Sequence, residues 1–184
     1  STIEGIYIEK CEAKECYDLS KLDTSEITDM SQLFEYSMFN GDISNWDVSS
    51  VVDMSKMFCA AKEFNQDINS WNVSKVIDME SMFCNAEKFN QPLNKWKTFN
   101  VIDMGKMFNN ALNFNQDIGT WDVSKVTSIS GIFEGTKMFS QNINSWSLDK
   151  IEYCEYMFFK AEAFQNKYNS GETLADYTED IKLW

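Results

Sequence analysis

The stretch FNQDINSWNVSKVIDMESMF, residues 64–83, recurs twice further along the chain in closely related form. FNQPLNKWKTFNVIDMGKMF occupies residues 89–108, and FNQDIGTWDVSKVTSISGIF occupies residues 114–133. The copies begin 25 residues apart. A fixed period of this length indicates stacked units, because a single unit cannot bury its apolar face alone.

Four apolar positions keep this interval along most of the chain. They are Trp46, Trp71, Trp96, Trp121 and Trp146; Phe58, Phe83, Phe108, Phe133 and Phe158; Ile43, Ile68, Leu93, Ile118 and Ile143; and Val51, Val76, Val101, Val126 and Ile151. Phe34 lies one residue closer to its successor. We expect the tryptophans of successive coils to share one buried apolar column.

Within one unit the apolar spacing changes. Ile68, Trp71 and Val73 end in the alternation that is typical of a short strand. Met82, Phe83, Ala86 and Phe89 follow at steps that suit a short helix or 3₁₀ turn. The sequence therefore predicts an α/β repeat solenoid with short parallel strands on one face and short helices or 3₁₀ turns on the other. A helical-hairpin solenoid needs two helices per unit, whereas a β-helix remains the closer alternative.

The length of 184 residues favours one domain. We expect a single unit over 1–184, with about five to six repeats over 27–165. Residues 1–26, which include the strand-like GIYIEKC, are the expected N-terminal cap. Residues 166–184 are the expected C-terminal cap, an amphipathic helix or tail that carries Leu174, Tyr177, Ile181, Leu183 and Trp184.

Charge and composition exclude several functions. The chain has 16 Lys plus Arg against 29 Asp plus Glu, a net charge of -13, and such a surface repels nucleic-acid phosphates and anionic lipid headgroups. The sequence contains no run of 18 apolar residues, so no membrane-spanning helix is predicted. The start STIEGIYIEK lacks the basic and apolar regions of a signal peptide. Histidine is absent, and the carboxylates recur in every unit instead of forming one singular constellation. We therefore expect no enzyme and no cofactor.

The repeat MFxxAxxFNQDIxxWxVSxVxDMS closely resembles that of BspA-like leucine-rich-repeat surface proteins, which are common among mycoplasma surface lipoproteins. The resemblance covers residues 27–165, although QPLNKWKTFN and the Ser128-Ile129 pair depart from the pattern. It implies a leucine-rich-repeat-like right-handed coil. It also implies a protein at the cell surface, or secreted, that contacts other proteins or host matrix.

Residues at equivalent positions of stacked coils form files. The amides Asn65, Asn90 and Asn115 and Gln66, Gln91, Gln116 and Gln141 are expected to bond backbone groups of the neighbouring coil. Two acidic files, Asp29, Asp53, Asp78 and Asp103, and Asp42, Asp67 and Asp117, are expected to cap the turns that follow them. Calcium binding by Asp53, Asp78 and Asp103 is the alternative.

The outer positions of the predicted strands vary most between units, and Phe99 is an exposed anchor among polar residues. The predicted partner-binding residues are Asp47, Asn72, Lys95, Lys97, Phe99, Thr120, Asp122 and Ser147. An ordinary solvated face is the competing interpretation. The expected partner is another protein, with the host matrix and cell-surface proteins as candidates. No metal site is expected through sulfur.

The five cysteines leave at least one unpaired within the chain. Cys11 and Cys16 are able to close a small loop, and Cys154 replaces a core methionine, which indicates a buried thiol. Cys59 and Cys84 occupy equivalent positions on the predicted helical side, where neighbouring turns usually sit too far apart for a bridge.

The sequence thus predicts a non-catalytic repeat scaffold for protein–protein interaction or adhesion. One alternative is a structural component of a larger assembly, such as a surface layer or viral shell. Another is a calcium- or glycan-dependent binding module. Neither the partner nor the oligomeric state follows from the sequence.

Overall fold

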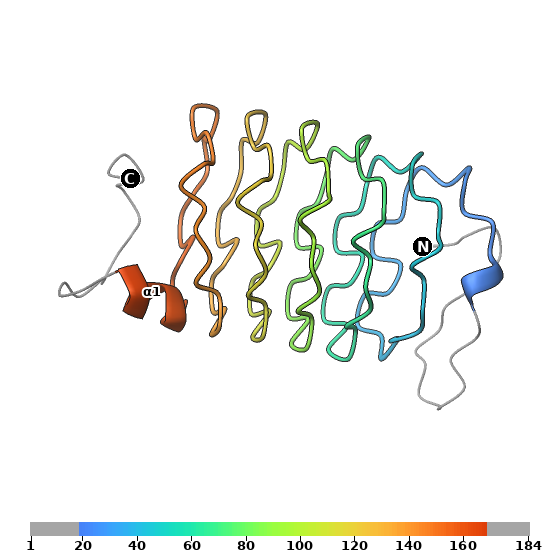
Figure 1. The fold of residues 1–184 in the computed structure, drawn as a ribbon, viewed down its shortest axis with the longest axis horizontal. Coiled ribbons are helices and arrows are strands. Elements are labelled where there is room, and N and C mark those ends of the chain that lie inside the picture. The colour runs from blue at the N-terminus through green and yellow to red at the C-terminus, as the bar shows by residue number, and fades with distance from the viewer. Residues whose placement is uncertain (1–18, 169–184) are drawn as a thin grey trace.

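A computed structural model describes residues 19–168 of the chain. The backbone winds through successive coils that lie side by side along the long axis (Figure 1). Within the described residues, helical structure is confined to the two ends: the 3₁₀ helix η1, Leu19–Lys21, and the α-helix α1, Glu162–Tyr168. Between them lie turns, irregular segments and isolated bridges.

Isolated parallel bridges mark where each coil meets the next. They join Asp29, Asp53, Asp78, Asp103, Ser128 and Tyr153 in succession, 24 residues apart at the first step and 25 at each later step. We number the coils from these residues: 29–52, 53–77, 78–102, 103–127 and 128–152, with a sixth coil beginning at 153. The shorter first coil explains the shorter interval after Phe34.

The segment that follows each bridge carries most of the backbone hydrogen bonds between coils, and we call it the ladder segment. In residues 53–60, every second N–H donates to a carbonyl of the next coil: Met54 to Asp78, Lys56 to Glu80, Phe58 to Met82 and Ala60 to Cys84, at 2.7–3.0 Å. The same segment forms overlapping turns on itself, because Met57 donates to the carbonyl of Met54, Cys59 to that of Lys56, and Ala61 to that of Phe58.

Two residues of each ladder segment are left-handed. Lys56 and Ala60 both have φ of 56°, and the same two positions are left-handed in the other ladder segments, where glycine occupies them only as Gly131 and Gly135. A run of right-handed residues would close its hydrogen bonds within a helix. The left-handed residues interrupt that run, so every second N–H stays available to the neighbouring coil, despite a cost of about 1–2 kcal/mol per non-glycine residue.

The predicted fold class, an α/β repeat solenoid with a leucine-rich-repeat-like coil, is therefore wrong. The described residues contain no extended strand and no sheet, only isolated bridges, and α1 is the one α-helix among them. The two predicted faces are also misassigned. The expected helix 82–89 overlaps a ladder segment, whereas the expected strand 68–73 is part of two turns, closed by Trp71 N–H to Ile68 and Val76 N–H to Val73.

The indole groups explain why no strand forms at the Trp-x-Val segment. The Nε1–H of Trp71 donates to the carbonyl of Ile43 at 3.1 Å, and Trp96 reaches the carbonyl of Ile68 in the same way. In a sheet, these carbonyls would accept a backbone N–H from the next strand. Here each of them accepts an indole N–H instead. The five tryptophans among the described residues are buried as predicted, one in each of the first five coils.

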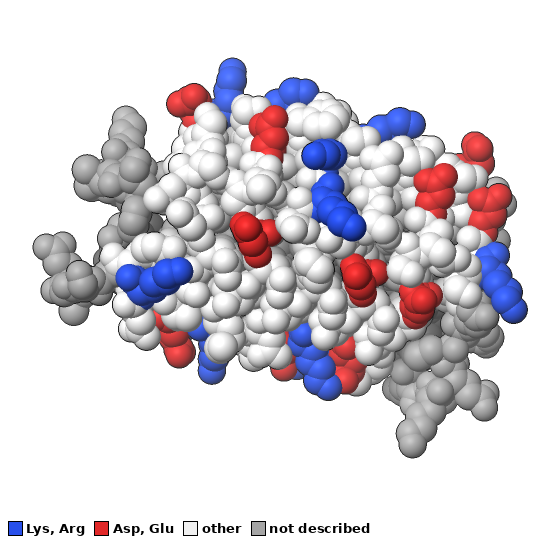
Figure 2. All heavy atoms as spheres, viewed as in Figure 1, with Lys and Arg blue, Asp and Glu red and all other residues white. Residues whose placement is uncertain are grey.

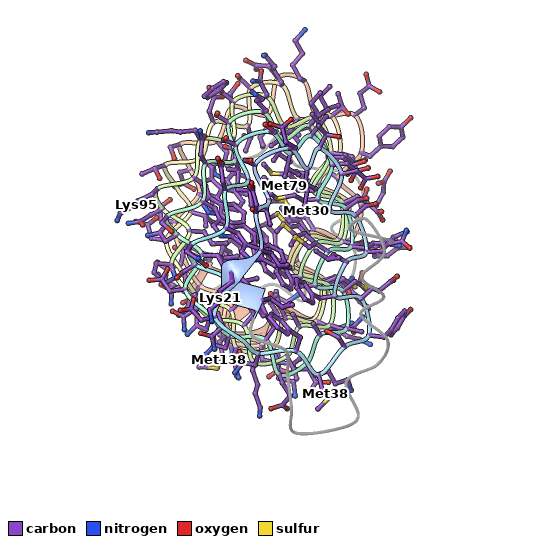
Figure 3. The ribbon with its side chains drawn as sticks, turned by 90° about the vertical axis from the view of Figure 1, so that its right-hand side faces the viewer. Lys21, Met30, Met38, Met79, Lys95 and Met138 are labelled. Atoms are coloured by element: carbon purple, nitrogen blue, oxygen red, sulfur yellow. The ribbon has the colours of Figure 1, made fainter. Side chains whose placement is uncertain are left out.

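Two columns of phenylalanine rings fill the core. One contains Phe34, Phe58, Phe83, Phe108, Phe133 and Phe158, with centroids 5.4–6.1 Å apart, and the other contains Phe39, Phe64, Phe89, Phe114, Phe139 and Phe164, at 5.9–6.5 Å. Within a coil the two rings stack face to face, as Phe58 does on Phe64 at 3.9 Å. Figure 3, which looks along the stack, places Met30 and Met79 inside the coils and Lys95 on the outside.

The predicted amide file is confirmed. The Oδ1 atoms of Asn40, Asn65, Asn90 and Asn115 each accept a backbone N–H from the next coil. The following glutamine side chains, Gln66, Gln91, Gln116 and Gln141, donate to the same asparagines. These contacts fix the register between coils outside the ladder segments.

Several predictions concern the chain ends. Most of the expected caps, 1–26 and 166–184, including GIYIEKC, Cys11 and Cys16, lies outside the described residues. Helix α1 begins at Glu162, before the predicted cap, and buries Phe164. The extent of a single 1–184 domain therefore stays a prediction.

Candidate functional site

The side of the stack that contains the Trp-x-Val segments consists of paired turns. We call it the turn face and define it as residues 43–51 with the equivalent residues 68–76, 93–101, 118–126 and 143–151. Side chains connect its coils: the Ser70 hydroxyl donates to the carbonyl of Ser44 at 3.1 Å, and the Asn69 Nδ2–H donates to the Oδ1 of Asn94 at 2.9 Å. The turn face is thus a continuous surface held by side-chain hydrogen bonds.

All predicted partner-binding residues lie on this face, and their side chains are exposed. They are Asp47, Asn72, Lys95, Lys97, Phe99, Thr120, Asp122 and Ser147. Lys95 projects away from the stack (Figure 3). The structure therefore brings these eight residues together on one side of the molecule, although the local conformation is a series of turns and not a strand.

Serine residues donate hydrogen bonds to the two carboxylates among these residues, those of Asp47 and Asp122. The backbone N–H of Ser49 donates to Asp47 and that of Ser124 donates to Asp122, each at 2.9 Å. Hydrogen bonds from the serine hydroxyl and then from its backbone N–H lower the pKa of each carboxyl. Both groups are therefore fully charged at neutral pH.

The third coil departs from this pattern and presents an aromatic ring. Thr98 replaces the valine that the first, second and fourth coils carry and is buried, with its hydroxyl donating to the carbonyl of Asp122 at 2.9 Å. Phe99 follows in the turn closed by the N–H of Val101, and 41% of its surface is exposed. The sequence KWKTFN therefore preserves the fold and adds an exposed aromatic ring to the turn face.

An exposed aliphatic file, which was not predicted from the sequence, lies next to the turn face. Val52, Ile77 and Ile102 are 38%, 41% and 44% exposed, and we call them the apolar stripe. Their backbones are in register, because Ile77 N–H donates to the carbonyl of Val52 and Ile102 N–H to that of Ile77, both at 2.8 Å. The signal in the sequence is the second residue of VVDM and VIDM.

The acidic file directly follows the apolar stripe, and its capping role is confirmed. Backbone N–H groups two residues further on donate to the Oδ1 atoms of Asp29, Asp53, Asp78 and Asp103. Asp42, Asp67 and Asp117 accept the same bond. Among residues 19–168, no group of three or more acidic or cysteine side chains is placed to hold a metal ion, so nothing favours the calcium alternative at Asp53, Asp78 and Asp103.

The central carboxylate of this file should respond to pH. Burial raises the pKa of Asp78, the N–H of Glu80 lowers it, and the charges of Asp53 and Asp103 add to the increase. A raised pKa in the folded state means that protonated Asp78 favours folding. This contribution is present below pH 3.8, the ordinary pKa, and is lost as the pH rises through the raised value.

Asp78→Asn should therefore increase the free energy of unfolding at pH 7 by about 1 kcal/mol, the scale of repulsion between two carboxylates about 5 Å apart in water. The amide can keep the capping bond, as Asn72 does for Ser74. Urea denaturation at pH 7 and at about pH 3.5 measures the effect, which should disappear at the lower pH. Asp122→Asn is the control with opposite sign, because its pKa is lowered. Destabilisation by both variants at pH 7 would contradict the explanation.

The charges elsewhere on the surface are mixed. On the face shown in Figure 2, basic and acidic side chains are interspersed, and neither sign gathers into one patch. Some of them pair between coils, as Lys62 does with Glu87 at 2.9 Å. No helix within residues 19–168 has the length and apolar character to cross a membrane.

The described residues define a repeat protein of stacked 25-residue coils with an aromatic core, an exposed turn face and an apolar stripe. A protein-family model matches residues 4–113 and again 89–179, and its description is "Mycoplasma protein of unknown function, DUF285". The chain belongs to this family. The two overlapping matches reflect the internal repeat. The match supports the mycoplasma part of the resemblance described above and does not extend to leucine-rich repeats. No curated protein matches the chain.

Proposed function

We propose that the chain is a non-catalytic repeat scaffold that binds another protein through the turn face and the apolar stripe. The observation that carries this proposal is the exposure of Val52, Ile77 and Ile102 on three successive coils, with Phe99 in the turn that precedes Ile102. Contiguous exposed apolar residues beside charged ones are typical of protein interaction sites.

The rigidity of the surrounding coils supports the same function. The stripe lies between backbone bonds on one side and side-chain bonds of the turn face on the other, including Asn100 Nδ2–H to the carbonyl of Ser74 at 2.9 Å. A surface held in this way loses little conformational entropy when a partner binds. The repeated carboxylates accept capping bonds, which supports a scaffold over a catalyst.

The family and the resemblance support a proposal about where the protein acts. Membership of a mycoplasma family, together with the likeness to BspA-like surface proteins, favours display at the microbial cell surface. The net charge of -13 disfavours nucleic acid and anionic lipid as ligands. A host matrix or cell-surface protein is therefore the partner class that we propose, with adhesion as the outcome.

Phe99→Ala should weaken binding about 30-fold, because aromatic anchors at interface centres contribute about 2 kcal/mol or more. The immobilised chain is exposed to purified host matrix and cell-surface proteins, and the dissociation constant of any ligand is measured for each variant. Met138→Ala is the matched control, since Met138 is also exposed but lies outside the turn face and the stripe.

Two results would contradict the proposal. Equal affinities of the two variants would show that the partner binds elsewhere. A chain that binds no host protein and forms ordered oligomers during sedimentation would instead be a structural component of a larger assembly.

A further inference from the structure

One register position of the ladder segments is chemically distinct from the core positions around it. Its occupants on the six coils are Glu35, Cys59, Cys84, Asn109, Glu134 and Phe159. Because the other coils place charged, amide or aromatic residues there, the two cysteines do not simply replace apolar core residues. Their adjacency on the second and third coils therefore requires its own explanation.

Side chains at this position meet from one coil to the next. The Nδ2–H of Asn109 donates to the Oε2 of Glu134 at 2.9 Å, and the Cys84 Sγ lies 4.0 Å from the Oδ1 of Asn109. Cys59 and Cys84 continue the file at equivalent positions of adjacent coils, and each thiol shifts the pKa of the other. Neither thiol is part of a disulfide in the structure.

The backbone holds the two cysteines in register. The N–H of Phe58 donates to the carbonyl of Met82 at 2.9 Å, and the N–H of Ala60 donates to that of Cys84 at 2.7 Å. Parallel segments bonded in this way lie about 4.8 Å apart, within the separation of about 4.4–6.8 Å between Cα atoms that a disulfide requires. The predicted wider separation of these residues is wrong, because no helices lie side by side at this position.

We propose that Cys59 and Cys84 are a dithiol site that closes to a disulfide between the second and third coils when the protein meets a low-molecular-weight disulfide. The bridge would join two coils that otherwise meet only through non-covalent contacts.

The two sulfurs differ in access and in acidity, which sets the order of the steps. Cys84 is half-buried, whereas Cys59 is only 8% exposed. The neighbouring Cys59 lowers the pKa of the Cys84 thiol, Cys84 raises that of the Cys59 thiol, and the nearby charge of Lys106 further lowers the pKa of Cys84. Cys84 is therefore the nucleophile that meets the oxidant, and Cys59 is the resolving thiol.

Two successive thiol–disulfide exchanges convert the dithiol to the disulfide. The Cys84 thiolate attacks one sulfur of the small disulfide, breaks its S–S bond and releases one small thiolate. Cys59 gives up its proton to that thiolate or to solvent and attacks the Cys84 Sγ, which expels the second small thiol. The protein loses two protons and two electrons, and the small disulfide takes them up to become two thiols.

Peptide mapping of the full chain tests the proposal. The reduced protein is incubated with oxidised glutathione at mildly alkaline pH, remaining thiols are alkylated, and the protein is digested with trypsin. The expected product joins residues 57–62, which contain Cys59, to residues 76–88, which contain Cys84, without retained glutathione. Separate glutathione adducts on the two peptides, or a bridge from either cysteine to Cys154, would overturn the proposal.

Single serine variants test the order of the steps. Cys59→Ser should trap a stable glutathione adduct on Cys84. In Cys84→Ser, glutathione should modify Cys59 at least about 10-fold more slowly than it modifies Cys84 in Cys59→Ser. Oxidation should raise the midpoint of thermal unfolding of the parent chain and leave those of both variants unchanged. Equal reaction rates of the two lone cysteines, or a parent chain whose midpoint does not rise, would also overturn the assignment.

Discussion

Replacing Phe83 with alanine is expected to lower the free energy of unfolding by about 3–5 kcal/mol, the range for removing a fully buried aromatic ring. The ring stacks on Phe58 at 5.5 Å and Phe108 at 5.7 Å in the neighbouring coils, and on Phe89 at 4.0 Å in its own coil. Its removal leaves a cavity in the middle of one aromatic column, next to Phe89 of the other. Because each coil is stabilised mainly by its two neighbours, the coils on both sides lose packing.

Urea denaturation followed by tryptophan fluorescence measures this loss, because buried indoles report on every coil from the first to the fifth. Phe99→Ala is the matched control: it removes the same ring from an exposed turn, and it should change stability by no more than about 0.5 kcal/mol. Similar losses from both variants would mean that the aromatic columns do not provide most of the stabilisation.

The stack and its core could be predicted from the sequence. A constant interval between Trp71, Trp96 and Trp121 requires equivalent environments in successive units, and burial follows because these residues are large and apolar. The amide file was predictable for a related reason. Equivalent polar residues in stacked coils face the backbone of the next coil, as Asn65 and Asn90 do.

The assignment of the two faces could not be predicted from apolar spacing. The residues Met82, Phe83, Ala86 and Phe89 have steps of three and four, and a helix and a series of overlapping turns bury such residues equally well. The deciding feature is the left-handed backbone at Ser81 and Asn85, and of these two residue types only asparagine is enriched in that conformation. The clearest signal is in the fifth coil, where Gly131 and Gly135 occupy both left-handed positions.

The candidate site was predicted in part. The exposed positions of the turn face alternate with buried Trp and Val, so their solvent exposure follows from the pattern. The apolar stripe was missed because Val51 and Val52 are adjacent apolar residues, of which one is buried and the other exposed. The sequence does not distinguish them, since the direction of each side chain depends on the ladder bonds made by the following residues.

The second large effect is expected at the amide file. Asn90→Ala should lower the free energy of unfolding by about 1–3 kcal/mol, the cost of leaving partly buried donors without an acceptor. The Asn90 Oδ1 accepts the backbone N–H of Asn115 and the Nε2–H of Gln116, both at 2.9 Å. Alanine cannot accept either bond, and the half-buried position limits the access of replacement water.

Asn40→Ala is the control that separates the effect of losing these hydrogen bonds from the effect of their burial. Asn40 accepts the same two bonds, from the N–H of Asn65 at 2.8 Å and the Nε2–H of Gln66 at 3.1 Å, but its side chain is exposed. Water can satisfy the freed donors there, so this variant should lose about 1 kcal/mol or less. Thermal and urea unfolding of both variants decide the point. If Asn40→Ala proves as destabilising as Asn90→Ala, the geometry of the bonds matters more than their burial, and the file would stabilise the stack equally at its end and at its centre.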